Sequence, residues 1–148
     1  FVAQNHGAKN TDRIREGYRL SMIVMLSWGV FCSFVLIVFP QLIFQVFIQE
    51  AEVLPMGVDY LRILGVSQLF MCMVITTAGA FSGLGKTLPP SIVSITLTGA
   101  RIPMAILLGR WLGLNGVWWA ITISSIGKGI VLLGWFLKDM KRAGMPER

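Results

Sequence analysis

Residues 91–111 read SIVSITLTGARIPMAILLGRW, which is about the length of a helix that crosses a bilayer. Arg101 lies near the midpoint of this stretch, where a guanidinium is unstable unless protein or water surrounds it. Ser94, Thr98 and Arg101 follow one another at steps of four and three residues, so they share one face of the helix. The stretch therefore predicts a membrane helix with a polar stripe that faces a cavity.

The composition of the whole chain is that of a membrane protein. Of its 148 residues, 55% are hydrophobic and only 14% are charged, and the mean hydropathy is +0.71. Soluble domains are about a quarter charged. The net charge of +6 comes mostly from basic residues at predicted helix ends, a placement that membrane topology explains. We expect an all-α integral membrane protein, a polytopic helical bundle in contact with membrane lipid, and no nucleic-acid partner.

Four apolar runs with few charges are long enough to span a bilayer as helices. The first covers residues 21–39, and the second begins at about residues 53–55 and ends at residue 84. The third and fourth cover residues 91–111 and 117–137. Pro40 marks the point where the first helix bends or stops, and residues 41–49 continue as an apolar tail at the interface. Glu50 and Glu52 form a short acidic loop. Residues 112–116 form a very short loop, so the last two helices are expected to be an antiparallel hairpin.

Local signals mark the ends of these helices. Gly7 is a candidate C-cap of a first short helical segment. The candidate N-caps of the next helix are Asn10, Thr11 and Asp12. Asp59 and Arg62 lie three residues apart and are candidates for a surface ion pair. The pair Gly79 and Gly83 permits the close approach of another helix in lipid.

The distribution of basic residues predicts the topology. Lys and Arg cluster in residues 9–19, at Lys86 and in residues 138–148, whereas the alternate loops hold mainly acidic residues. The basic side is therefore expected to be cytoplasmic, with a cytoplasmic tail at 138–148. We expect a multi-pass protein of the plasma membrane of a bacterium or archaeon. Phe1 begins what reads as the end of an apolar segment, so we interpret the chain as a fragment of a longer protein.

Two cations lie at membrane depth, Arg101 and Lys128, and no embedded carboxylate of this chain is available to pair with them. One interpretation is that each side chain caps backbone carbonyls or reaches toward the interface. The other is that both face a water-filled substrate cavity, which is the usual role of charges inside a membrane. Ser125, one turn before Lys128, would share that cavity.

Several chemistries find no support in the sequence. Residues 80–87 fit a loose phosphate-binding loop, but an apolar helix precedes them where that loop needs a strand. Cys32 and Cys72 fall inside apolar runs and are read as small buried hydrophobic residues. His6, the single histidine, has no embedded acid or nucleophile placed to work with it. We expect no metal site, no cofactor and no enzyme activity.

Three motifs, in this order and spacing, resemble the multidrug and toxic-compound extrusion (MATE) transporters. The first is residues 2–8, VAQNHGA; the second opens with residues 59–62, DYLR, and ends with residues 83–90, GLGKTLPP; the third is residues 101–103, RIP, followed by residues 114–120, LNGVWWA. The motif positions are Gln4, Gly7, Ala8, Tyr60, Arg62, Gly83, Gly85, Thr87, Pro103 and Gly116.

The resemblance implies a parent of twelve helices in two lobes, of which residues 1–148 are the end of helix eight through helix twelve. Its partner would be the missing N-terminal lobe. Such proteins export organic cations and other small amphipathic drugs in exchange for H⁺ or Na⁺. By its spacing from the turn after Gly83, Met71 stands where sodium-coupled members carry an acid, so a coupling acid would lie in the missing part. The expected cavity residues are Ser94, Thr98, Arg101, Ser125, Lys128 and Met71.

Two other functions remain open at this point. The two embedded cations would suit a related flippase for lipid-linked sugars or other anionic lipids, because they could bind pyrophosphate headgroups. A non-transporting membrane subunit that only packs against partners is a further alternative. In either transporter, Pro40 and Pro103 are candidate hinge points for alternating access.

Overall fold

The computed structural model describes residues 1–47 and 52–143, and its regular elements are all helices. The helices are α1 (Val2–Gly7), α2 (Thr11–Val38), α3 (Pro40–Phe47), α4 (Leu54–Gly83), α5 (Leu88–Leu112) and α6 (Leu114–Ala143). Four of them, α2, α4, α5 and α6, are long and apolar enough to cross a membrane. The prediction of an all-α membrane protein with four spanning helices is confirmed.

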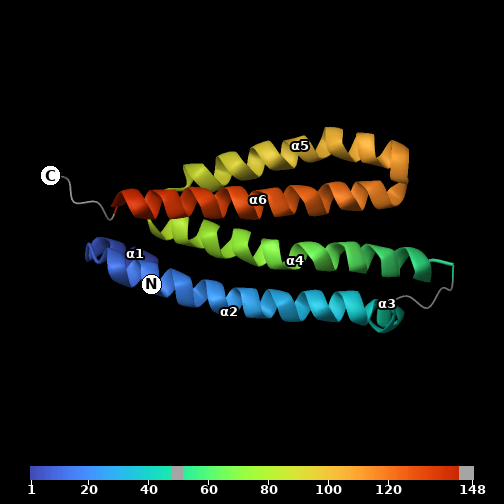
Figure 1. The fold of residues 1–148 in the computed structure, drawn as a ribbon, viewed down its shortest axis with the longest axis horizontal. Helices are drawn as coiled ribbons and strands as arrows, with labels where there is room; N and C mark the ends of the chain where they lie inside the picture. Colours follow the sequence, from blue (N-terminus) through green and yellow to red (C-terminus); the bar gives the residue numbers. More distant parts are fainter. Residues whose placement is uncertain (48–51, 144–148) are drawn as a thin grey trace.

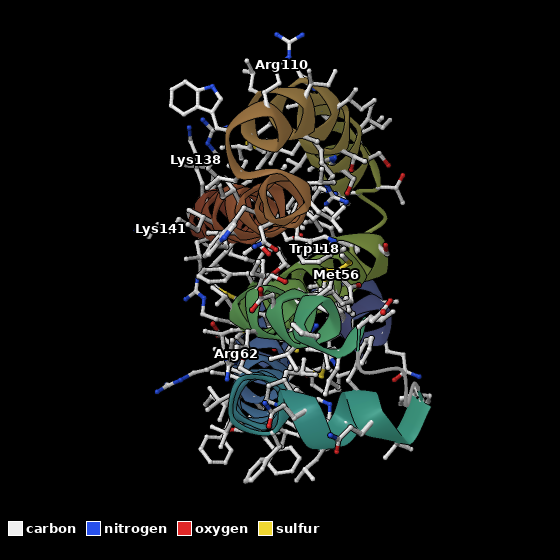
Figure 2. All side chains as sticks on the ribbon, turned by 90° about the vertical axis from the view of Figure 1, so that its right-hand side faces the viewer. Met56, Arg62, Arg110, Trp118, Lys138 and Lys141 are labelled. Atoms are coloured by element: carbon white, nitrogen blue, oxygen red, sulfur yellow. The ribbon has the colours of Figure 1, made fainter. Side chains whose placement is uncertain are left out.

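The four long helices lie side by side in the order α2, α4, α6, α5, and an end view shows the same order in a single layer (Figures 1 and 2). Helix α6 packs against both α4 and α5, whereas α4 and α5 barely touch each other. All four long helices carry exposed large apolar side chains, such as Val24 at 66% on α2 and Ile95 at 74% on α5. Such a surface is compatible with contact with lipid or with further helices.

Prolines, glycines and one cap set the helix ends. The Asn10 side chain accepts a hydrogen bond from the Arg13 backbone N–H at 3.2 Å, so Asn10 is the N-cap among the three candidates. Helix α2 ends at Val38 and α3 starts at Pro40, as predicted. The first segment ends one residue later than expected: Ala8, and not Gly7, is the C-cap. Lys9 then turns the chain with a positive φ of 55°, a conformation more often left to glycine.

The hairpin of α5 and α6 is tighter than the sequence indicated. Gly113, with φ +61°, makes the connection alone, and α6 already begins at Leu114 where residues 112–116 were expected to be loop. At its other end α6 continues to Ala143, beyond the predicted limit of residue 137. Gly116 permits the tight hairpin, because a Cβ at this position would collide with the carbonyl group of Leu108.

Small residues set the close contacts between the long helices. A Cβ at Gly65 would lie 3.4 Å from the Ser33 carbonyl oxygen, and one at Gly129 would lie 3.1 Å from the Phe70 carbonyl oxygen. The two glycines of the predicted Gly-x-x-x-Gly pair differ in their surroundings. A Cβ at Gly83 would meet Val2 of α1, but Gly79 has open space around it. Close approach of helix backbones is therefore achieved mainly at glycines that the Gly-x-x-x-Gly pattern did not identify.

The best-packed part of the layer lies at the basic end, where α2, α4 and α6 converge with the start of α5. Phe136 is 1% exposed, and its ring centroid lies 4.2 Å from that of Tyr18 and 5.2 Å from that of Phe81. The Tyr18 hydroxyl is hydrogen-bonded to the Thr77 Oγ1 at 2.8 Å. Burial of an aromatic ring together with a satisfied hydroxyl stabilises this end of the helix layer.

The expected ion pair between Asp59 and Arg62 is not formed. Both side chains are exposed, and Figure 2 shows Arg62 projecting away from the layer. Among the described residues the ion pair is instead Lys86 with Asp139, whose Nζ and Oδ2 atoms are 2.7 Å apart. It ties the turn between α4 and α5 to the end of α6. The expectations for Glu50 and for residues 144–148 of the basic tail lie outside the described residues.

We expect Gly129→Val to lower the thermal stability of the full-length protein in detergent by an amount equivalent to about 1–3 kcal/mol. The added side chain would meet the backbone of Phe70 and separate α6 from α4. The matched control is Gly134→Val in the same helix, because a Cβ at Gly134 meets nothing within 4 Å. Equal melting temperatures for the two variants would show that the Gly129 contact does not hold these helices together.

Candidate functional site

Arg101, the cation at the centre of α5, is bound by the facing helix. Its Nε donates a hydrogen bond to the Ser124 Oγ on α6 at 2.8 Å. The Ser124 hydroxyl in turn donates to the Ile121 carbonyl oxygen at 3.0 Å, and Ser124 is 3% exposed. The guanidinium is half-buried. A polar side chain of the neighbouring helix therefore satisfies part of the hydrogen-bonding capacity of Arg101.

Lys128 makes a second polar contact between the same two helices. Its Nζ donates to the Thr98 Oγ1 at 2.6 Å. Because α5 and α6 are antiparallel, the pair of Thr98 and Lys128 lies about one helical turn from the pair of Arg101 and Ser124. We call these four residues the polar layer. Three of them are among the predicted cavity residues. Ser124 is not, although it lies four residues before Lys128 and so on the same side of α6.

The polar layer carries two positive charges on adjacent turns. Within residues 1–47 and 52–143, the salt bridge of Lys86 and Asp139 is the one ion pair, so neither Arg101 nor Lys128 has a carboxylate partner there. Like charges repel in a medium of low dielectric constant. Hydroxyl groups satisfy the N–H donors but do not neutralise the charge. The layer therefore has the electrostatics of a site that attracts an anion or an electron-rich group.

The polar layer is separate from the apolar side of α6. Ile123, Ile130 and Leu137 are spaced by seven residues and are 45%, 57% and 49% exposed, which is typical of a face in contact with lipid. Lys128 and Ser125 lie on another side of the helix, three residues apart. Lys128 is thus kept off the most exposed apolar stripe of α6.

The other expected cavity residues occupy different environments. Ser125 is 4% exposed, and its Oγ donates to the Ile121 carbonyl oxygen of its own helix at 2.9 Å. Ser94 is half-buried and Thr98 is exposed. Met71 is 47% exposed on α4, a helix that α5 barely touches. The structure thus pairs Thr98 with Lys128, places Arg101 about one turn away with Ser124 as its partner, and leaves Met71 on a different helix.

Residues of the three sequence motifs meet in space. Tyr60 of the second motif packs on Trp118 of the third, with ring centroids 5.4 Å apart. Gly83 of the second motif lies against Val2 of the first. Gly85 adopts a φ of +72° in the turn before α5, and the Thr87 carbonyl oxygen accepts a hydrogen bond from the Ser91 Oγ at 2.9 Å. These motif residues therefore lie at the ends of the helix layer, whereas Arg101 of the third motif belongs to the polar layer.

The apolar helix α4 leads directly into residues 80–87, so the strand required by a phosphate-binding loop is not present there. In the described part of the chain, no group of three or more His, Cys, Asp or Glu residues could hold a metal ion. Cys72 is buried and Cys32 is half-buried, and both are free thiols. The polar layer itself offers two cations and two hydroxyl groups for binding.

We expect Arg101→Ala and Ser124→Ala to be coupled in a double-mutant cycle of thermal unfolding, with a coupling energy of about 0.6–1.7 kcal/mol. The reason is the hydrogen bond of 2.8 Å between the two side chains. Arg101→Ala combined with Ser125→Ala is the control, because the Ser125 hydroxyl bonds to its own helix. Additive effects in both cycles would mean that the Arg101 contact contributes nothing to helix association.

Comparison with known proteins places these features in a family. The MatE family model matches residues 1–107. The chain is 29% identical to a probable multidrug resistance protein NorM of Thermotoga maritima, over 97% of this chain and 32% of that protein. It is 26% identical to a NorM protein of Mesorhizobium japonicum, over 93% of this chain and 32% of the relative. It is 22% identical to the human multidrug and toxin extrusion protein 1, over 89% of this chain and 24% of the relative.

The chain thus spans between a quarter and a third of the length of these curated relatives. The family match covers α1 to α4 and most of α5, including the turn with Gly85 and the central Arg101. Four apolar helices of spanning length agree with a membrane transporter. The chain belongs to the MatE family.

Proposed function

We propose that this chain is part of the C-terminal lobe of a secondary active antiporter that exports organic cations and other small amphipathic drugs in exchange for H⁺ or Na⁺. The observation that carries the proposal is family membership, and the polar layer, with Arg101 and Lys128 hydrogen-bonded across α5 and α6 in the middle of apolar helices, gives it a candidate transport site. Family membership and relatives named as multidrug resistance proteins support a multidrug transporter. We place the whole protein in the plasma membrane, with its basic end in the cytoplasm.

The charge of the polar layer bears on the coupling mechanism. No Asp or Glu lies near Arg101 or Lys128 in the described sequence, and Met71 holds the position at which an acid is expected in sodium-coupled members. The ion-binding acid would then belong to the other lobe. Alternating access would require the two lobes to rock about a cavity between them, with ion binding shifting the population of the two states.

A flippase for lipid-linked sugars or other anionic lipids is the second candidate. Two cations without carboxylate partners favour a phosphate-bearing substrate over an organic cation, because a cationic drug would be repelled by this layer. The third possibility, a membrane subunit without transport activity, requires that the polar layer be closed off from water by neighbouring helices.

Arg101→Ala in the full-length protein is expected to reduce efflux at least about tenfold, since it removes a charge-assisted hydrogen bond at the site. Amounts of protein in the membrane should not change. Arg110→Ala is the control, because Arg110 projects from the end of the layer in Figure 2. Unchanged drug resistance of cells that express Arg101→Ala would exclude Arg101 from the transport site.

Cysteine labelling separates the two transporters from the non-transporting subunit. Thr98→Cys is expected to react with a membrane-impermeant maleimide, because Thr98 is exposed and would face a water-filled cavity. Leu107→Cys is the control on the opposite side of the same helix, nine residues or about half a turn of the helix circumference from Thr98, where the side chain is 62% exposed but would face lipid. Protection of both positions would support the subunit interpretation and contradict a cavity at the polar layer.

A further inference from the structure

A hollow of about 240 Å³ lies between α2 and α6 at the basic end of the layer. Its lining residues are Arg15, Tyr18, Phe136, Leu137, Met140 and Lys141. Two of them are cations and the others supply aromatic and aliphatic surface. We call it the Arg15–Lys141 hollow. It is far along α6 from the polar layer, since Lys141 follows Lys128 by thirteen residues, or about 20 Å of helix.

Arg15 is held in place at the rim of the hollow. Its Nη2 donates to the Met140 carbonyl oxygen at 3.4 Å, near the end of α6. A guanidinium has five N–H donors, so this contact leaves others to bind an anion. Lys141 is exposed, and Figure 2 shows it projecting from the same side of the layer as Arg62 and Lys138.

The surroundings of the hollow favour an anion. The described acidic residues of this end are Asp12, Glu16 and Asp139, and none of them lines the hollow. Asp139 is already bound to Lys86 at 2.7 Å. Two cations that share a hollow without an acid in its lining attract a phosphate more strongly than either cation alone.

An apolar path leads from the hollow into the membrane. Ile130, Leu137 and Lys141 lie on one side of α6, at steps of seven and four residues. Ile130 and Leu137 are 57% and 49% exposed. The eleven residues from Lys141 to Ile130 correspond to about 16 Å of helix, which is about the depth of one leaflet of hydrocarbon. A headgroup at the hollow would therefore place an acyl chain along this stripe.

We propose that the Arg15–Lys141 hollow binds an anionic phospholipid of the leaflet at the basic end, with the phosphate between the two cations and an acyl chain along α6. Such a lipid would bridge α2 and α6, which flank α4 on opposite sides in the layer. A soluble phosphate would use the cations alone, whereas the exposed apolar stripe next to them fits a lipid.

The test is native mass spectrometry of the purified full-length protein, titrated with phosphatidylglycerol and with phosphatidylethanolamine of the same acyl chains. The wild-type protein is expected to retain phosphatidylglycerol preferentially. The double variant Arg15→Gln with Lys141→Gln should bind it at least about tenfold more weakly, since each basic residue contributes roughly a fivefold change. Lys9→Gln with Arg13→Gln removes the same charge at the same end and should change binding less than about twofold.

A second variant separates weaker lipid binding from a loss of folding in the double variant Arg15→Gln with Lys141→Gln. Lys141→Glu changes an exposed side chain for which the described structure shows no hydrogen bond, so the fold is expected to persist while lipid binding falls. Equal losses in the two double variants would overturn the proposal, since binding would then depend only on overall charge. Equal retention of phosphatidylethanolamine would also overturn it, as would release of the lipid by millimolar inorganic phosphate.

Discussion

A cation inside the hydrocarbon of a membrane must find polar partners, and this chain supplies them from the neighbouring helix. Arg101 donates to Ser124, and Lys128 donates to Thr98, so that each helix of the α5–α6 hairpin contributes one cation and one hydroxyl. The reciprocal arrangement requires antiparallel helices in one register. The tight connection at Gly113 and the contact of Gly116 with Leu108 set that register.

Close packing of the remaining helices depends on where side chains are smallest. Gly65 and Gly129 bring α4 close to α2 and α6, and interhelical hydroxyl contacts reinforce both interfaces. The Ser33 Oγ donates to the Gly65 carbonyl oxygen at 2.6 Å, and the Thr122 Oγ1 donates to the Ile63 carbonyl oxygen at 3.1 Å. In lipid, where hydrophobic burial does not drive helix association, such contacts decide which helices are neighbours. They leave α5 attached mainly to α6, with its other sides open to lipid, water or further helices.

The two cationic regions of the molecule differ in their surroundings. At the polar layer, cations lie among hydroxyl groups in the middle of the spans, which suits recognition of a transported molecule. At the basic end, Arg15 and Lys141 lie beside Phe136 and Leu137, which suits a lipid whose headgroup and chain need different partners. A charged group gains its specificity from what surrounds it as much as from its own chemistry.

The amino-acid sequence alone predicts the number of spanning helices, their approximate limits, the family resemblance and the presence of two cations at depth, because length, hydropathy and the positions of Pro and Gly are local properties. It placed the end of α6 too early and the hairpin loop too long, because no local signal shows that residues 138–143 and 114–116 stay helical when packed against other helices. Three features are visible only in the folded structure: Ser124 meets Arg101, Asp139 pairs with Lys86, and Gly129 lies at a helix interface whereas Gly79 does not. Each of these depends on which faces of distant helices meet, and periodicity within one helix does not contain that information.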